Sequence, residues 1–124
     1  MADLEKYLLK MKRLQDKKNE SIRLSADGEV FEFQMLPDDK YEDIQARIVE
    51  FNSDPKSVRM DLILRDLVYF SCEEIRNPEL FAELNIVDPT DIVGKLFSKA
   101  EISAIGTELM FFNGMTDTDV VKKL

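Results

Sequence analysis

Histidine and tryptophan are absent from this chain of 124 residues, and cysteine occurs once, as Cys72. Without histidine, Ser-His-Asp and Cys-His triads, histidine proton shuttles and histidine-bearing zinc sites are excluded. A single cysteine excludes an intrachain disulfide framework and suits a reducing cytosol. The four glycines are too scattered to form a GxxxxGK[ST] or GxGxxG phosphate loop. The sequence therefore favours a binding protein over an enzyme, and we expect no catalytic residue, metal or cofactor.

Long hydrophobic runs are also absent, since none approaches the roughly 20 residues of a membrane-spanning helix. Lys6, Lys10, Lys12 and Arg13 interrupt the apolar residues near the N-terminus, so we expect no signal peptide. The net charge is −8, and residues 1–20 carry six Lys/Arg against four Asp/Glu, which leaves an excess negative charge on the rest. An acidic body repels nucleic-acid phosphates and anionic lipid. We therefore expect a cytoplasmic protein with neither nucleic acid nor membrane as its partner.

Three segments are predicted: an N-terminal arm over residues 1–20, a single domain over 21–114 and a polar tail over 115–124. The arm is predicted to be an amphipathic helix from Asp3 to about Glu20. At 100° per residue, its apolar side chains share a stripe of roughly 120°. These side chains are Leu4, Tyr7, Leu8, Met11 and Leu14, with Lys6, Lys10, Arg13 and Lys17 on the opposite side. Folding back on the body and docking on a partner are both open for this helix, whereas the acidic body opposes membrane binding.

A β-hairpin is predicted over residues 21–35, because polar and apolar residues alternate on both sides of Asp27-Gly28, a pair that favours a tight turn. Its apolar face carries Ile22, Leu24, Phe31, Phe33 and Met35. A lone hairpin is marginal in water. The apolar face therefore covers helices, or the hairpin pairs with strands of another copy, which would make a homo-oligomer through the hairpin edge.

From Pro37 onward the apolar period changes to about 3.6, which predicts helices. The first is expected to end near Asn52, and the second to run from Asp54-Pro55 to about Ile75 as the central helix of the core. Further helices are expected to start at Asn77-Pro78, at Asp88-Pro89 and at a Ser98/Glu101 capping box, the last of them ending at Asn113-Gly114. The expected fold is mainly α, with a body of four or five helices, one N-terminal β-hairpin and the amphipathic N-terminal helix; it is α+β by strict count.

Each group of side chains that could react or bind a metal ion is interpreted here as part of the structure instead. Cys72 is interpreted as a core residue, because Glu73 and Glu74 beside it would raise the thiol pKa. The acidic cluster at residues 38–43 is interpreted as offsetting a helix dipole rather than holding a hard cation. The acidic pairs at residues 61 and 66, 73 and 74, and 79 and 83 are interpreted as solvated helix faces. Asp117-Thr118-Asp119 is interpreted as a cap in the tail, not as a calcium loop.

The last helix has apolar residues on a second side, where Phe111 and Met115 are expected to lie together. Such a helix is fully buried or serves a second surface, and Met and Phe suit adaptable binding surfaces. The candidate partner-binding residues are Leu4, Leu8, Met11, Phe111 and Met115.

The order of these features resembles the XkdN-like tail assembly chaperones of phages and prophages of Gram-positive bacteria. The resemblance covers about residues 30–121 and rests on the order and spacing of short stretches of sequence. The stretches that carry it are Tyr41-Glu42-Asp43-Ile44-Gln45, Asn77-Pro78-Glu79-Leu80, Ile86-Val87, Asp91 before Ile92-Val93, Ser98-Lys99-Ala100-Glu101-Ile102, Asn113-Gly114 and Val120-Val121-Lys122-Lys123.

The resemblance implies a non-enzymatic chaperone in the cytoplasm of the bacterial host. Such a chaperone would bind the tape measure protein, keep its long helices from aggregating and recruit tail tube subunits. The alternative is a small acidic regulatory adaptor or antitoxin-like protein that uses its N-terminal helix to occlude one globular target.

Overall fold

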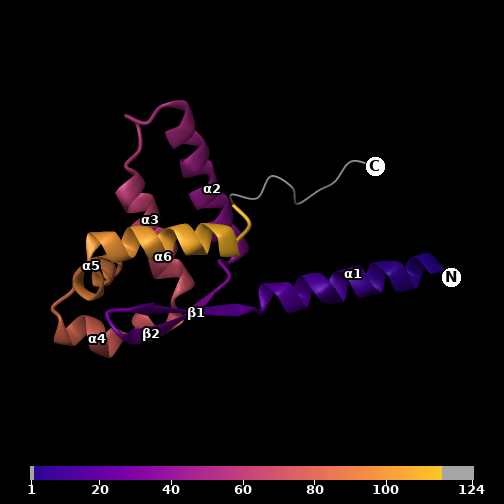
Figure 1. Cartoon of the computed structure of the whole chain (residues 1–124), viewed down its shortest axis with the longest axis horizontal. Coiled ribbons are helices and arrows are strands. Elements are labelled where there is room, and N and C mark those ends of the chain that lie inside the picture. Colours follow the sequence, from indigo (N-terminus) through magenta and orange to yellow (C-terminus); the bar gives the residue numbers. More distant parts are fainter. Residues whose placement is uncertain (1, 116–124) are drawn as a thin grey trace.

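The computed structural model of the chain describes residues 2–115, with side-chain exposure from residue 3 onward. The predicted fold class is confirmed: the described part is mainly α-helical, with one antiparallel hairpin near the N-terminus. The elements are α1 (Ala2–Lys18), β1 (Ser21–Ala26), β2 (Glu29–Gln34), α2 (Asp38–Ser53), α3 (Met60–Ser71), η1 (Glu73–Ile75), α4 (Pro78–Glu83), η2 (Pro89–Asp91), α5 (Ile92–Leu96) and α6 (Lys99–Phe112). In Figure 1 the helical body lies over the hairpin, and α1 points away from both.

The hairpin forms where the alternating pattern predicts it. Asp27 and Gly28 both have positive φ, 52° and 80°, which is the backbone of a two-residue type I′ turn. The register runs from Ser21 opposite Gln34 to Ala26 opposite Glu29. Phe33 is fully buried, and Phe31 packs edge-on against Phe97 with ring centroids 4.8 Å apart. The apolar face of the hairpin is therefore covered by the helical body of the same chain.

Helix α3 is the centre of the core. Its Ile63, Leu67 and Val68 are fully buried, and α2, α5 and α6 each pack against it. α3 and α6 approach each other closely at Gly106, where an added Cβ would lie 2.7 Å from Cδ2 of Leu64. Glycine at this position lets the two helices pack tightly.

The predicted central helix from residue 54 to residue 75 is wrong at both ends. Asp54 accepts hydrogen bonds at its side chain from the Lys56 N–H (3.2 Å) and at its carbonyl from the Ser57 N–H (3.1 Å), which closes a turn instead of capping a helix. The α-helix starts only at Met60. It ends at Ser71, because Cys72 adopts an extended backbone before the separate 3₁₀ turn η1.

The helix starts predicted at Asn77-Pro78 and at Ser98 are confirmed, whereas Asp88-Pro89 opens the 3₁₀ turn η2 and the α-helix α5 follows at Ile92. Asn77 and Asp88 each accept a backbone N–H two residues ahead, and Ser98 and Glu101 form the reciprocal capping box at the start of α6. At the end of α6, Gly114 has a φ of 73°. The Met115 N–H bonds to the Met110 carbonyl (2.9 Å), and the Gly114 N–H bonds to the Phe111 carbonyl (3.0 Å). This pair of bonds is a Schellman motif, which reverses the chain.

A buried amide ties the end of α6 to the start of α2. The Oδ1 atom of Asn113 accepts the N–H of Leu36 (3.0 Å), while its Nδ2 donates to the Leu109 carbonyl (2.8 Å). Both Asn113 and Leu36 are 7% exposed. Because the Leu36 N–H is buried away from water, the Asn113 side chain takes the place of water as its hydrogen-bond acceptor.

We predict that Asn113→Ala lowers the free energy of unfolding by about 1–3 kcal/mol, because it leaves the Leu36 N–H buried and unpaired. Urea unfolding followed by circular dichroism measures the change. The matched control is Asn52→Ala at the exposed end of α2, expected to stay within about 0.5 kcal/mol of the unsubstituted protein. Equal losses in the two variants would contradict this role of Asn113.

Candidate functional site

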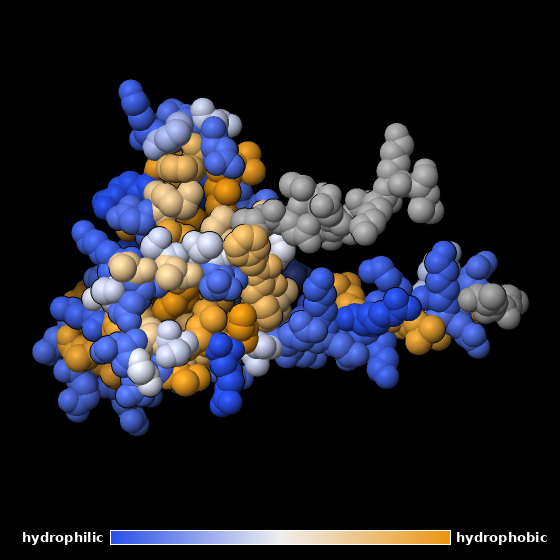
Figure 2. Space-filling model, in the orientation of Figure 1, coloured by the Kyte–Doolittle hydropathy of each residue, from blue (hydrophilic) through white to orange (hydrophobic). Residues whose placement is uncertain are grey.

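The N-terminal helix α1 presents its apolar stripe to solvent. Every residue from Asp3 to Lys18 is exposed, so the structure does not bear out the fold-back alternative. Leu4, Tyr7, Leu8, Met11 and Leu14 are 60%, 64%, 51%, 51% and 47% exposed, respectively. In Figure 2 apolar patches interrupt the hydrophilic surface of the projecting helix. Three of the five predicted binding residues therefore lie on one accessible helix face.

Sequence composition explains why α1 is helical without a tertiary partner. Leu, Lys, Met and Gln are good helix formers. Acidic residues in the first turn and Lys17 and Lys18 in the last turn both complement the helix dipole. The helix has 17 residues, only just above the length of about 12–15 residues below which isolated helices are marginal. The helix therefore lacks the stabilisation that burial of its apolar stripe would supply.

The junction between α1 and the body is weakly held. Among the described residues, the one ion pair across this junction joins Lys18 Nζ to Asp38 Oδ2 at 3.3 Å, and both side chains are well exposed. An exposed pair of this kind contributes about 0–1 kcal/mol. Little therefore fixes the orientation of the arm relative to the body.

The second predicted surface is only partly as expected. Phe111 lies on the outer side of α6 and is 62% exposed. Met115 does not continue that helix, because α6 ends at Phe112 and the chain reverses at Gly114. Its side chain is half-buried and packs against the core. The expectation that Phe111 and Met115 share one helix is corrected, although both retain accessible surface.

Cys72 is a core residue, as its sequence neighbours indicated. Its side chain is fully buried, and Sγ donates a 3.5 Å hydrogen bond to the Glu32 carbonyl. Burial raises the pKa of the thiol to about 11, and the charge of Glu74 adds to this effect. At neutral pH the sulfur is therefore a protonated thiol, which is a poor nucleophile.

The acidic clusters are partly engaged in ion pairs. Asp66 is half-buried rather than solvated, and it accepts from Arg47 at 2.8 Å and from Arg65 at 3.1 Å. This corrects its assignment to a solvated helix face. Asp61 is exposed, and a hydrogen bond from Arg59 lowers its pKa.

Within residues 2–115, no three His, Cys, Asp or Glu side chains are grouped to hold a metal ion. Asp117-Thr118-Asp119 and the rest of the tail after Met115 lie outside the described residues.

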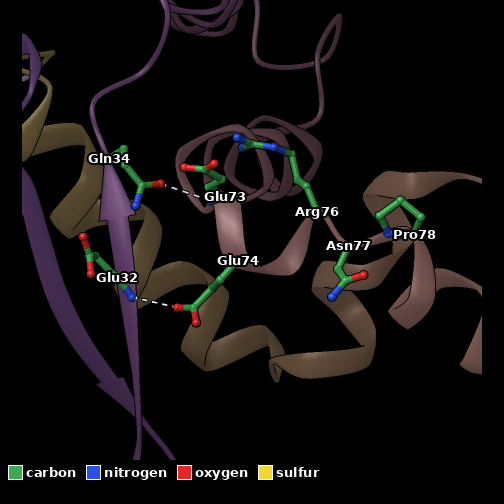
Figure 3. Close-up of a pocket in the computed structure, with 7 residues that line it drawn as sticks. All are labelled: Glu32, Gln34, Glu73, Glu74, Arg76, Asn77 and Pro78. Atoms are coloured by element: carbon green, nitrogen blue, oxygen red, sulfur yellow. Dashed lines mark hydrogen bonds between the residues drawn. The ribbon is translucent and has the colours of Figure 1, made fainter.

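Two of the hollows on the body lie at the elements named above. One, of about 570 Å³, lies beside β2 and is lined mainly by polar and charged side chains. Figure 3 shows how Gln34 and the backbone of Glu32 face Glu73 and Glu74 across it. The other, of about 640 Å³, lies between α3 and the α5–α6 corner and includes Leu62, Leu64, Phe97 and Ile102 in its wall. The sequence pattern predicted that these apolar residues belong to the core. Periodicity alone does not reveal that the ends of the helices leave a groove between them.

No helix in the described part of the chain has both the length and the apolar character needed to cross a membrane. No protein-family model, curated protein or solved structure matches the chain.

The burial of Cys72 predicts its reactivity and a pH effect. In the native protein we expect alkylation by iodoacetamide at pH 8 to be far slower than in the urea-unfolded chain. Because the thiol pKa rises from 9.0 to about 11 on folding, the unfolded chain loses its proton first, and stability falls as pH rises through that interval. Cys72→Ala should lack this fall, which urea titrations at pH 8 and pH 10.5 would reveal. Equal labelling rates in native and unfolded protein would contradict a buried thiol.

Proposed function

We propose that this protein is a non-enzymatic phage or prophage tail assembly chaperone that uses α1 to bind helical segments of the tape measure protein and recruits tail tube subunits. The observation that carries the proposal is the exposed apolar stripe on α1, detached from the body. An amphipathic helix with an uncovered apolar face suits binding to a second amphipathic helix or an apolar groove. The resemblance in element order supplies the identity of the partners.

The size of the stripe supports a weak, reversible contact per copy. Its five side chains are each about half exposed, so burying the remainder contributes about 1 kcal/mol each, or about 5 kcal/mol together. Association costs about 4–15 kcal/mol in lost freedom. One arm alone therefore binds weakly. Several copies along one long partner would add affinity through multivalency, while each contact could still be released as the tail tube assembles.

Charge supports a separate helical partner over pairing between two arms. Residues 1–20 have an excess of two positive charges, whereas the chain as a whole has a net charge of −8. Two basic arms repel each other, while a partner helix with acidic flanks attracts the arm. The acidic body is suited to keeping a complex with an apolar partner in solution. Phe111 and the accessible part of Met115 are proposed as an additional contact surface.

The proposal includes the absence of catalysis and an assembly role in the host cytoplasm. The protonated, buried state of Cys72 and the ion pairs of Asp61 and Asp66 support the first point, since none of these groups is poised as a nucleophile or base.

The alternative is a regulatory adaptor or antitoxin-like protein, which the single projecting helix also supports, because one such helix suits the groove of one globular target. Stoichiometry separates the two. A chaperone for a long helical protein binds in several copies per partner chain, whereas an adaptor binds with one helix per target.

The test is co-expression with the tape measure protein that the proposal expects to be encoded beside this chain, followed by co-purification and light scattering. We expect the tape measure protein to stay in the soluble fraction with several copies bound. Leu8→Ser should reduce co-purification at least about fivefold, because it removes about 1 kcal/mol at each of several linked contacts. The matched control is Leu9→Ser: Leu9 is 55% exposed on the same helix but lies on the other side, outside the stripe.

An insoluble tape measure protein, or no co-purification, would contradict the chaperone function. Equal losses from Leu8→Ser and Leu9→Ser would contradict recognition through the stripe. A one-to-one complex with a globular protein would favour the adaptor.

A further inference from the structure

The two edges of the hairpin differ. On the outer edge of β2, the Glu32 N–H donates to Glu74 Oε1 (2.8 Å), and the Glu32 carbonyl accepts from the Cys72 thiol (3.5 Å). The Gln34 side chain accepts the Glu73 N–H (3.1 Å). Figure 3 shows the Glu32–Glu74 and Gln34–Glu73 contacts. This edge is therefore closed by η1 and by the chain around it.

The outer edge of β1 is open. Arg23 lies opposite Glu32 in the register. Since the backbone groups of Glu32 point away from β1, those of Arg23 point away from β2. The same alternation turns Ser21 and Ser25 outward. All three residues are exposed. Among the residues that the structure describes, no hydrogen bond from outside the hairpin reaches the backbone of Arg23 or Ser25.

This edge lacks most of the features that usually prevent strand addition. β1 is six residues long, Ser21–Ala26, with no proline and no bulge in its continuous register. Its only charge is Arg23. Because a two-stranded sheet is marginal on its own, an added strand would stabilise it.

We propose that the outer edge of β1 binds the same edge of a second copy of this chain, in antiparallel orientation, to form a four-stranded sheet across a two-fold axis. An edge rotated by 180° presents donors to acceptors, so one strand is complementary to itself. Charge favours a second copy at this place. The chain carries −8 overall and generally repels its own copies, but β1 contains no carboxylate.

The charge of Arg23 also selects the register. A pairing centred on Arg23 would place two cations opposite each other, which is destabilising. Centring the pair on Leu24 instead places Arg23 opposite Ser25 of the second copy. That register brings the two Leu24 side chains together and continues the apolar face of the hairpin from one copy to the other. Four backbone hydrogen bonds then form from Arg23 and Ser25 of the two copies.

The dimer is independent of the proposed chaperone function, because it uses β1 and leaves the apolar stripe of α1 free. A dimer that also binds a tape measure protein would present two arms, which raises the affinity for a long partner through effective concentration.

Sedimentation equilibrium of the full chain tests the proposal. A strand–strand contact is small, so the concentration series extends to about 1 mM. We expect the mass to rise from monomer to dimer. Ser25→Lys should weaken the dimer roughly tenfold, because two Lys–Arg pairs then oppose each other, and Ser25→Glu should strengthen it. The matched control is Val30→Lys, which adds the same charge at an exposed position on β2, directly across from Ser25.

Amide hydrogen exchange gives a site-specific readout. The N–H groups of Arg23 and Ser25 should become protected as the dimer forms, while those of α1 do not. A monomer throughout the series would overturn the proposal. So would a dimer that responds equally to Ser25→Lys and Val30→Lys, with circular dichroism showing both variants folded. A dimer lost on Leu8→Ser instead would assign the contact to the arms and also overturn it.

Discussion

The fold depends on the burial of one apolar hairpin face against the helical body, where β1 meets α6, β2 meets η1 and Phe31 meets Phe97. A two-stranded hairpin is marginal in water, and here Phe33 is fully buried and Phe31 packs on Phe97. The end of α6 also meets the segment between β2 and α2, where Asn113 accepts the Leu36 N–H. The helices thus stabilise the strands. The arm can project because the body completes its core without it.

The apolar side chains of the body and those of α1 therefore have separate roles. The side chains that hold the body together belong to residues 22–115, and those of α1 contribute nothing to that core. Apolar surface that folding does not use is available for binding. The same separation makes the arm adjustable, since one exposed ion pair between Lys18 and Asp38 is weak. Binding by the arm and folding of the body are therefore expected to respond to different substitutions.

Local chemistry predicted most of the elements, whereas contacts distant in sequence were not predictable. The turn at Asp27-Gly28 and the caps at Asn77, Asp88 and Ser98 follow from side chains acting within three residues. Asp54-Pro55 carries the same signal, but Asp54 closes a turn there, and the pattern does not distinguish these outcomes. Periodicity identified the stripe on α1 but not whether the body covers it. The closure of β2 by residues about 40 positions away had no signal in the sequence.

The apolar stripe of α1 is uncovered in the free protein, and we propose that a helical partner covers it. Amide hydrogen exchange of α1 in the dilute free chain, compared with α3, measures this directly. Exchange in α1 should be orders of magnitude faster than in α3, because only local fraying is needed to open an unpacked helix, and it should slow when a tape measure segment is added. Protection of α1 equal to that of α3 in the free monomer would contradict the account.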